Sequence, residues 1–199
     1  VVHVNSIASI RGDYTTEASG KKLKKNRLRQ WEKSDVIYRN DDIFNERLYA
    51  IQWIKELPDG DSSRAPTEFR TVTQADLDRE KRVNEYVQAH LAEWQERGWV
   101  PDTRIESGDK TDEPIRTRGW THWHQLFNPR QLLIAGLVRK HSREPGAIQL
   151  LHAINWNARL VTWNRHAGSG TPQQVFINQA LNTIYDYGCR GSTFFFPLL

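Results

Sequence analysis

The segment from Arg118 to Leu133 combines a dense aromatic and basic run with a clear helix start. Two Trp, one Phe, two His and two Arg lie within its sixteen positions. Asn128 can cap the helix with its side-chain oxygen, and Pro129 suits the first helical position, where no N–H is needed. Aromatic clusters usually pack, which favours a core wedge. The alternative is a surface for a nucleic acid or a partner protein.

The composition is that of a globular domain with a mild positive charge. The chain has 199 residues, 38% of them hydrophobic, and a formal net charge of +4. This length suits one domain, or one and a fraction, and the charge permits an anionic partner without requiring one. The single cysteine, Cys189, excludes an internal disulfide framework and a Cys-based zinc site within the chain.

The hydropathy and the two ends of the sequence bear on the cellular compartment and on the extent of the chain. No secretory signal and no apolar run near membrane-spanning length occurs, so we expect a cytoplasmic protein with no membrane partner. The chain contains no Met, begins Val1-Val2 and closes on an apolar tail from Phe194 to Leu199. These features favour an excerpt of a larger protein, or ends that pack on a partner.

Residues 1–34 lack clear periodicity and contain a strongly basic stretch. Six of the nine residues from 21 to 29 are Lys or Arg. Runs of like charge are often disordered, which favours a solvated arm or linker. The functional alternative is an arm that neutralises phosphates and releases their counterions. The candidate phosphate-contacting residues are Lys21, Lys22, Lys24, Lys25, Arg27 and Arg29.

Alternating hydrophobicity predicts strands between residues 35 and 72. A short strand is expected at 35–39 and a longer one at 48–54, with Tyr49, Ile51 and Trp53 on one face. A turn signal at 58–61 precedes residues 68–72, which can pair back as a further strand. This region therefore predicts a small antiparallel sheet.

Helical periodicity dominates the remainder of the chain. Thr73 and Asp76 resemble a capping box that begins a helix ending near Arg97, before Gly98. Further helices are expected at residues 129–143, 147–162 and 172–187, with a polar loop at 98–118. The expected fold is α+β, with a small antiparallel sheet in the N-terminal third and a mainly helical remainder. The expected units are a basic arm (1–34), a β region (35–72) and a helical region (73–199).

Three groups of residues are candidates for site chemistry. His122 and His124 would point the same way on a strand, but no third metal ligand is nearby, so stacking or hydrogen bonding is favoured. The glycine-rich stretch 168–172 precedes an expected helix, yet a flexible loop is favoured over a phosphate site. Cys189 lacks an adjacent base and is a weak nucleophile candidate.

A second aromatic–polar cluster lies near the C-terminal end of the chain. Its planar amides and Arg beside Trp suit either base recognition or helix packing, and packing is slightly favoured. Its members are Asn155, Trp156, Asn157, Arg159, Trp163 and Asn164.

Residues 120–133 resemble a signature of large bacterial adenine-specific DNA methylases, the very long type often encoded beside phage-defence genes. That signature reads approximately Trp, then Leu-Phe, then Thr or Asn, then Pro-Arg-Gln-Leu-Leu. Three further blocks are similar, at residues 41–53, 64–68 and 157–163, the last together with 176–187. The resemblance covers about residues 35–187, and the Pro-Arg-Gln-Leu-Leu block is its most specific element.

The motifs that carry the chemistry of that family are missing here. Family members bind S-adenosylmethionine through an early glycine-rich segment and methylate adenine N6 with a later Asn/Asp-Pro-Pro-Tyr motif. The chain has no Pro-Pro pair and lacks the cysteines of the family's zinc ribbon, and residues 188–192 depart from the family pattern. The resemblance therefore implies a central insert, with no catalytic residue, no metal and no cofactor of its own. S-adenosylmethionine is expected for the parent enzyme.

The resemblance implies an accessory or target-recognition region that contacts DNA or frames the catalytic region. Such an enzyme must extrude adenine from the duplex, and basic and aromatic contacts support that step. The candidate residues are Arg118, Trp120, Trp123 and Arg130, with the basic stretch on phosphates. The expected partners are DNA and the catalytic methyltransferase region or other subunits. The alternatives are a protein-interaction scaffold of a phage-defence complex without DNA contact and, least favoured, a small independent enzyme.

Overall fold

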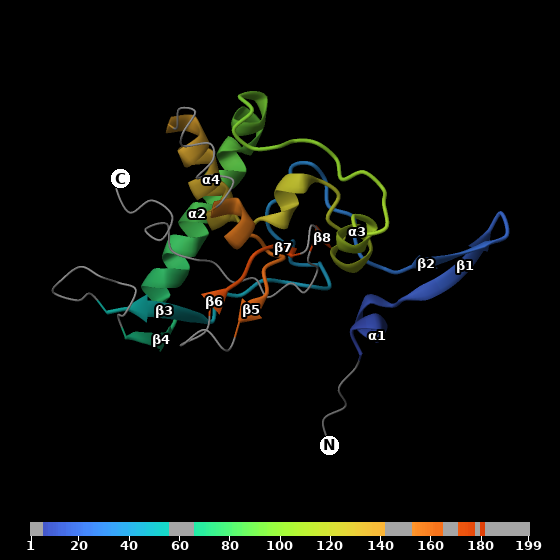
Figure 1. Cartoon of the computed structure of the whole chain (residues 1–199), viewed down its shortest axis with the longest axis horizontal. Helices are drawn as coiled ribbons and strands as arrows, with labels where there is room; N and C mark the ends of the chain where they lie inside the picture. The colour runs from blue at the N-terminus through green and yellow to red at the C-terminus, as the bar shows by residue number, and fades with distance from the viewer. Residues whose placement is uncertain (1–5, 56–65, 142–152, 165–170, 178–179, 182–199) are drawn as a thin grey trace, which may run out of the picture.

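The computed structural model describes residues 6–55, 66–141, 153–164, 171–177 and 180–181. The described residues form helices and short antiparallel hairpins (Figure 1), which confirms the predicted α+β class. The elements are α1 (Ile7–Arg11), β1 (Tyr14–Ala18), β2 (Lys21–Lys25), β3 (Ala50–Ile54), β4 (Thr67–Thr71), α2 (Gln74–Glu96), α3 (Asp112–Arg118), the 3-10 helix η2 (Trp123–Leu126), α4 (Pro129–His141), β5 (Trp163–Asn164), β6 (Thr171–Pro172), β7 (Phe176–Ile177) and β8 (Ala180–Leu181).

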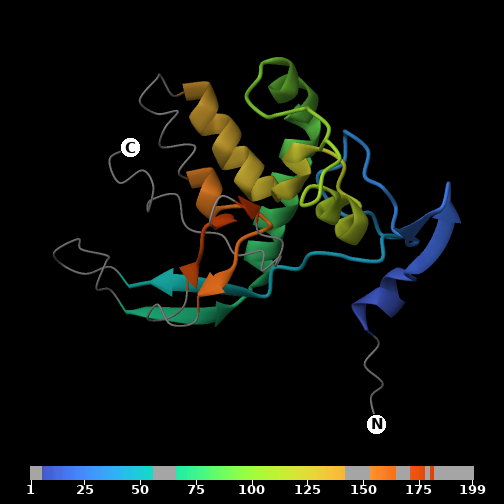
Figure 2. The same ribbon diagram turned by 45° about the vertical axis from the view of Figure 1, so that its right-hand side comes forward.

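The basic stretch forms a hairpin rather than a disordered arm. Strands β1 and β2 pair antiparallel, with Tyr14 opposite Lys25. The two turn residues, Ser19 and Gly20, have φ values of 53° and 73°, which suit the twist of a tight hairpin. Both views show this hairpin extending away from the remainder of the molecule (Figures 1 and 2). The favoured interpretation of residues 21–25 as a disordered arm was wrong, because cross-strand pairing orders them.

The predicted pairing of residues 48–54 with residues 68–72 is confirmed. Strands β3 and β4 lie antiparallel, with Ile51 opposite Arg70. The short strand expected at 35–39 is absent, and these residues form no regular element. Val36 and Tyr38 are buried in two different core clusters, so their alternation reflects burial from an irregular chain.

Helix α2 begins and ends where the sequence predicts. The Thr73 and Asp76 side chains form the expected capping box, and Gly98 follows the helix with a φ of 67°. Its buried face packs on α4, where Gly136 lets the Trp94 ring approach closely. No helix among the described residues is long and apolar enough to cross a lipid bilayer.

Two of the later expected helices were wrong over the residues that can be compared. In the expected helix 147–162, only residues 153–156 are helical within the described part, and Trp163–Asn164 then pairs with Thr171–Pro172. The start expected at residue 172 is therefore a strand, while residues 182–187 lie outside the described residues. The expected loop 98–118 contains α3. The apolar spacing predicted a helix here, but the buried side chains of Ala158, Leu160 and Val161 come from a turn.

Two buried clusters position the candidate site. One lies between α2 and α4 and includes Val87, Leu91 and Leu132. The other gathers distant segments beneath η2 and α3, and its largest members are Trp31 and Trp120. The signature segment 120–133 thus contributes to both clusters, so its side chains organise the interior.

Candidate nucleic-acid interface

The helix start at residues 128–131 is formed as the sequence predicts. Asn128 Oδ1 accepts a hydrogen bond of 3.0 Å from the backbone N–H of Gln131, and the Asn128 N–H donates to Gln131 Oε1 at 2.9 Å. These bonds satisfy donors that the first turn of α4 leaves without helical partners. Both side chains are buried. This part of the signature is therefore an internal brace that sets the direction of α4.

The buried amide of Gln125 ties the aromatic run to an earlier part of the chain. Its Oε1 atom accepts hydrogen bonds from the N–H groups of Thr121 at 2.7 Å and His122 at 3.0 Å. Its Nε2 atom donates to the carbonyl of Glu32 at 2.6 Å. The Thr121 hydroxyl donates to the Trp31 carbonyl at 2.6 Å. Every polar atom of this amide is used inside the protein.

Arg159 is fully buried and connects four segments. Its guanidinium donates to the carbonyl oxygens of Gln125 at 2.7 Å, Phe127 at 2.6 Å and Val36 at 3.2 Å. It also forms an ion pair with both carboxylate oxygens of Glu46. A buried charge is tolerated only when its donors are satisfied and it has a counter-charge. Arg159 meets both conditions, so it holds the second aromatic–polar cluster in a structural role.

Trp120 lies in the interior beside this arginine. Its side chain is 0% exposed, and the Arg159 guanidinium carbon lies 5.3 Å from its ring centroid. The Trp31 ring meets it edge-on at 6.3 Å. A ring without exposed surface has no face for a base, so the interpretation of Trp120 as a nucleic-acid contact was wrong. Trp123 is half-buried and packs against the same cluster.

The two arginines that flank the aromatic run already have intramolecular contacts. Arg118 is half-buried, with its guanidinium carbon 5.0 Å from the Phe44 ring centroid and a 2.9 Å bond to the Thr117 carbonyl. Arg130 pairs with Glu80 at 2.8 Å. Burial raises the pKa of the Glu80 carboxyl, and Arg130 opposes that shift. Each of these two cations is therefore already engaged with a group of the same chain.

Arg29 belongs to the interior network rather than to the basic surface. It makes two 2.8 Å bonds to the Asp42 carboxylate and one of 2.5 Å to Asp35, which also accepts from Arg39. The Asp42 carboxylate is the largest cause of the raised pKa of Arg29. Burial alone would raise the pKa of Asp42, but bonds from Arg29 and the Arg39 N–H outweigh it and lower that pKa. Arg29 is thus engaged with two carboxylates of its own chain, and its phosphate contact stays a prediction.

The remaining basic residues do form an exposed surface. Lys22, Lys24 and Lys25 on β2 and Arg27 just beyond it are exposed. Lys21 belongs to the same strand, opposite Ala18. None of the ion pairs within the described part of the chain involves Lys22, Lys24 or Lys25. We call the exposed side chains of Lys22, Lys24, Lys25 and Arg27 the basic hairpin surface.

The two histidines of the aromatic run have different surroundings. His124 is 0% exposed, and burial lowers its pKa to about 4. Its Nδ1 atom lies 3.3 Å from Gln95 Nε2. His122 Nδ1 lies 2.8 Å from the Thr121 hydroxyl, and burial also lowers its pKa. Within the residues that the structure describes, no three metal-binding side chains gather. Cys189 and residues 168–170 lie outside those residues.

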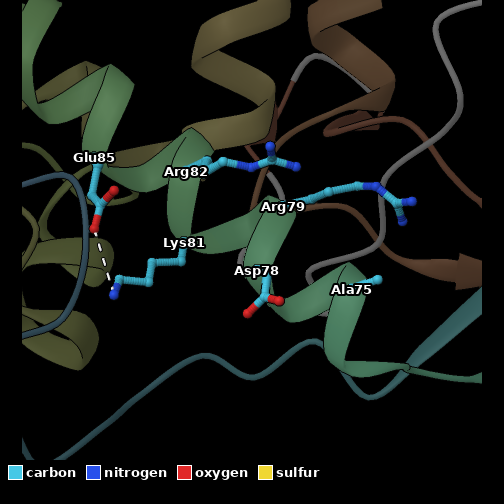
Figure 3. Close-up of a pocket in the computed structure, with 6 residues that line it drawn as sticks. All are labelled: Ala75, Asp78, Arg79, Lys81, Arg82 and Glu85. Atoms are coloured by element: carbon cyan, nitrogen blue, oxygen red, sulfur yellow. Dashed lines mark ion pairs between the residues drawn. The ribbon is translucent and has the colours of Figure 1, made fainter.

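Sequence reasoning overlooked a depression along α2 that is lined by three basic and two acidic side chains, and Arg79 in it pairs with Asp76 at 2.7 Å. Figure 3 shows Arg79 and Arg82 extending to the same side of the helix, whereas Lys81 extends to the other side and pairs with Glu85. An adjoining depression reaches Leu133 on α4. The i, i+3 spacing of the two arginines was the available signal, because such residues are neighbours on one helix face.

Comparison with known proteins adds no relative. No family model matches the chain, and no curated protein or solved structure matches it. The resemblance to adenine-specific DNA methylases therefore stays a prediction that depends on the residues quoted for it.

Proposed function

We propose that this chain is a non-catalytic accessory region of a bacterial DNA adenine-N6 methyltransferase and that it contacts DNA phosphates through the basic hairpin surface. The observation that carries the proposal is the set of exposed cations on a hairpin that extends away from the molecule (Figure 2). In this proposal, S-adenosylmethionine and the catalytic residues belong to the remainder of the enzyme.

The hairpin geometry suits phosphate contact. Alternation along β2 places Lys22 and Lys24 on one face and Lys25 on the other. The cross-strand partners of Lys24 and Lys25 are Thr15 and Tyr14, which carry no charge at neutral pH. Both faces of the hairpin therefore present cations. Each cation that neutralises a phosphate releases counterions, so binding of this kind falls steeply with salt.

A salt titration with a charge-matched control tests the proposal. The triple variant Lys22→Gln, Lys24→Gln and Lys25→Gln should lower affinity for a short duplex and reduce the log–log salt slope by about 3, roughly one unit per lost contact. The control variant Arg104→Gln, Lys81→Gln and Lys110→Gln removes the same charge from exposed sites elsewhere. Equal losses in both variants, or an unchanged slope in the first, would contradict a specific role for the hairpin.

The α2 depression favours a second candidate function, contact with another protein region. Arg79 and Arg82 border a surface that continues to Val83, Tyr86 and Leu133. Cations at the edge of a partly apolar surface suit an acidic and apolar partner. This function predicts that Arg82→Glu abolishes co-purification with the remainder of the enzyme and leaves duplex affinity nearly unchanged. Intact co-purification would contradict it.

A further inference from the structure

One face of the β3–β4 hairpin presents two aromatic rings in a row that ends in a cation on either side. Positions 47, 49, 51, 53 and 55 share one side of an extended chain, and they are Arg47, Tyr49, Ile51, Trp53 and Lys55. Tyr49 is 83% exposed and Trp53 is 48% exposed. Exposed Trp and Tyr side chains so close together are costly in water unless another molecule covers them.

The partner strand adds a cation to this face. Arg70 lies opposite Ile51 in the register, and its guanidinium carbon lies 5.3 Å from the Trp53 ring centroid. Arg70 also pairs with Glu68, which lies opposite Trp53. The guanidinium and the indole thus form a cation–π pair, and rings and arginines of this kind are the groups on which nucleobases stack.

The opposite face of the same hairpin differs in kind. Phe69 lies on that face, and its ring centroid is 6.2 Å from that of Trp163 on β5. In both views β5 lies beside β3–β4 (Figures 1 and 2). One face therefore contacts the molecule, and the face with Tyr49 and Trp53 is directed away from that contact.

We propose that this outer face binds unpaired nucleobases, with Trp53 and Tyr49 stacking on the bases and Arg47 and Lys55 contacting the backbone phosphates. The charge pattern favours a nucleic acid, because residues 47–55 and 66–72 carry three basic side chains and one acidic one. Cations flanking exposed rings are the arrangement that single-strand-binding grooves use. An acidic partner protein would engage the cations without requiring the rings.

The site extends the proposed DNA contact to a second surface and a different ligand. In both views the β3–β4 hairpin lies on the opposite side of the molecule from the basic hairpin surface. The inference therefore stands even where the basic hairpin surface does not bind duplex DNA. Its ring row spans about 13 Å between Tyr49 and Trp53, from about 3.3 Å per residue, which suits a short run of bases.

The test compares a single strand with a duplex on the whole chain. Fluorescence anisotropy with labelled oligothymidylate of about ten nucleotides should show about a tenfold loss of affinity for Trp53→Ala, because each stacked base contributes strongly. Trp53→Phe should retain most of the affinity, since a ring remains. Phe69→Ala, on the other face, should stay within about twofold of the parent chain. Circular dichroism and thermal unfolding verify that each variant is folded.

The outcomes separate this site from its alternatives and from the hairpin proposal. Loss of single-strand binding in Trp53→Ala with duplex binding intact supports the site, and the lysine triple variant should show the reverse pattern. Equal losses in Trp53→Ala and Phe69→Ala, or no measurable binding of the oligothymidylate at about 50 mM salt, would overturn it. Analytical sedimentation tests whether the same face instead joins two copies of the chain. Loss of self-association in Trp53→Ala, with single-strand affinity unchanged, would overturn the nucleobase site.

Discussion

The β1–β2 hairpin and the segment from Trp120 to Gln131 are both rich in the basic, aromatic and amide residue types that nucleic-acid-binding proteins commonly use. On the hairpin, Lys22 and Lys24 remain exposed. In the segment, Trp120 and Gln125 are fully buried and contact residues from distant parts of the chain. A residue type therefore indicates a ligand site only when the side chain is exposed and is not used in packing or hydrogen bonding within the protein.

The contrast also occurs within a few residues of the basic stretch. Arg27 is exposed, whereas Arg29, two positions later, binds Asp35 and Asp42. The carboxylates of Asp35 and Asp42 follow Arg29 in the chain, and the path of the chain between them places both beside its guanidinium. Charge density along the sequence could not separate the two arginines, because the difference lies in which acids the fold supplies.

The largest effect on the interior region should come from Arg159→Met. The change leaves three carbonyl oxygens and the Glu46 carboxylate without their donor. Removing one partner of a buried ion pair costs about 3–5 kcal/mol, so we expect the free energy of unfolding in urea to fall by at least about 4 kcal/mol. Arg104→Met, at an exposed site, is the control. If Arg159→Met lost DNA affinity and kept its stability, Arg159 would be a ligand contact, and the interior region would no longer differ from the basic hairpin surface.

Acid should destabilise the interior through His124. Its pKa is lowered to about 4 by burial, from 6.5 when it is solvated, so the unfolded chain binds the extra proton first as pH falls. Stability contributed by neutral His124 is therefore complete above about pH 6.5 and is lost progressively down to about pH 4. The full loss is about 3.5 kcal/mol, at about 1.4 kcal/mol per pKa unit.

Urea unfolding at several pH values measures this loss. His124→Asn should flatten most of the decline between pH 6.5 and pH 4, and a small slope should remain because the pKa of His122 is lowered too. Asp42, whose pKa is lowered from 3.8, contributes to the decline only at more acidic pH. A parent chain with constant stability over the same range would contradict the burial of the His124 ring.

Trp120→Phe should have a smaller effect, which distinguishes a core ring from a stacking ring. The smaller ring leaves a cavity beside Arg159 and Trp31 and weakens the cation–π contact. We expect about 2 kcal/mol of lost unfolding free energy, with nucleic-acid affinity unchanged in the folded variant. Trp53→Phe is the matched change at an exposed ring. The assignment of Trp120 to the core would fail if its substitution weakened nucleic-acid binding and left stability intact.

Local patterns in the sequence predicted the elements whose stability is local. The capping bonds at Thr73 and Asn128 join residues only three positions apart, so both helix starts were predictable. The β3–β4 pairing followed from alternation and the turn signal at residues 58–61. The α+β class followed from these elements together.

The sequence could not predict features that depend on distant partners. Arg159 and Glu46 are 113 positions apart, and no local pattern marks them as a pair. Ala158 and Val161 are spaced as a helix would bury them, but the backbone turns at these residues instead. For the candidate site, the same limit applied to Arg29 and Trp120. The basic hairpin surface was identifiable by charge, although its strand pairing was not.

The smallest effect on stability should come from the three lysines of the basic hairpin surface. In the triple variant Lys22→Gln, Lys24→Gln and Lys25→Gln, we expect unfolding free energy to change by less than about 0.5 kcal/mol, because exposed side chains contribute little. Removing three like charges from one strand relieves repulsion, whereas Lys22→Gln removes the charge opposite Glu17, so the two effects oppose each other. Urea unfolding of this variant and of the Arg104, Lys81 and Lys110 control measures the change.

The small stability change matters because the same lysine variant should have the largest effect on the salt dependence of duplex binding. A residue kept for a ligand contributes to binding and little to folding, whereas a residue kept for the fold does the reverse. Loss of more than about 2 kcal/mol in the lysine variant would place Lys22, Lys24 and Lys25 in the second group, as point changes of that size require a buried or strained site. The two regions would then no longer differ in kind, and the duplex-binding role of the hairpin would lose its physical basis.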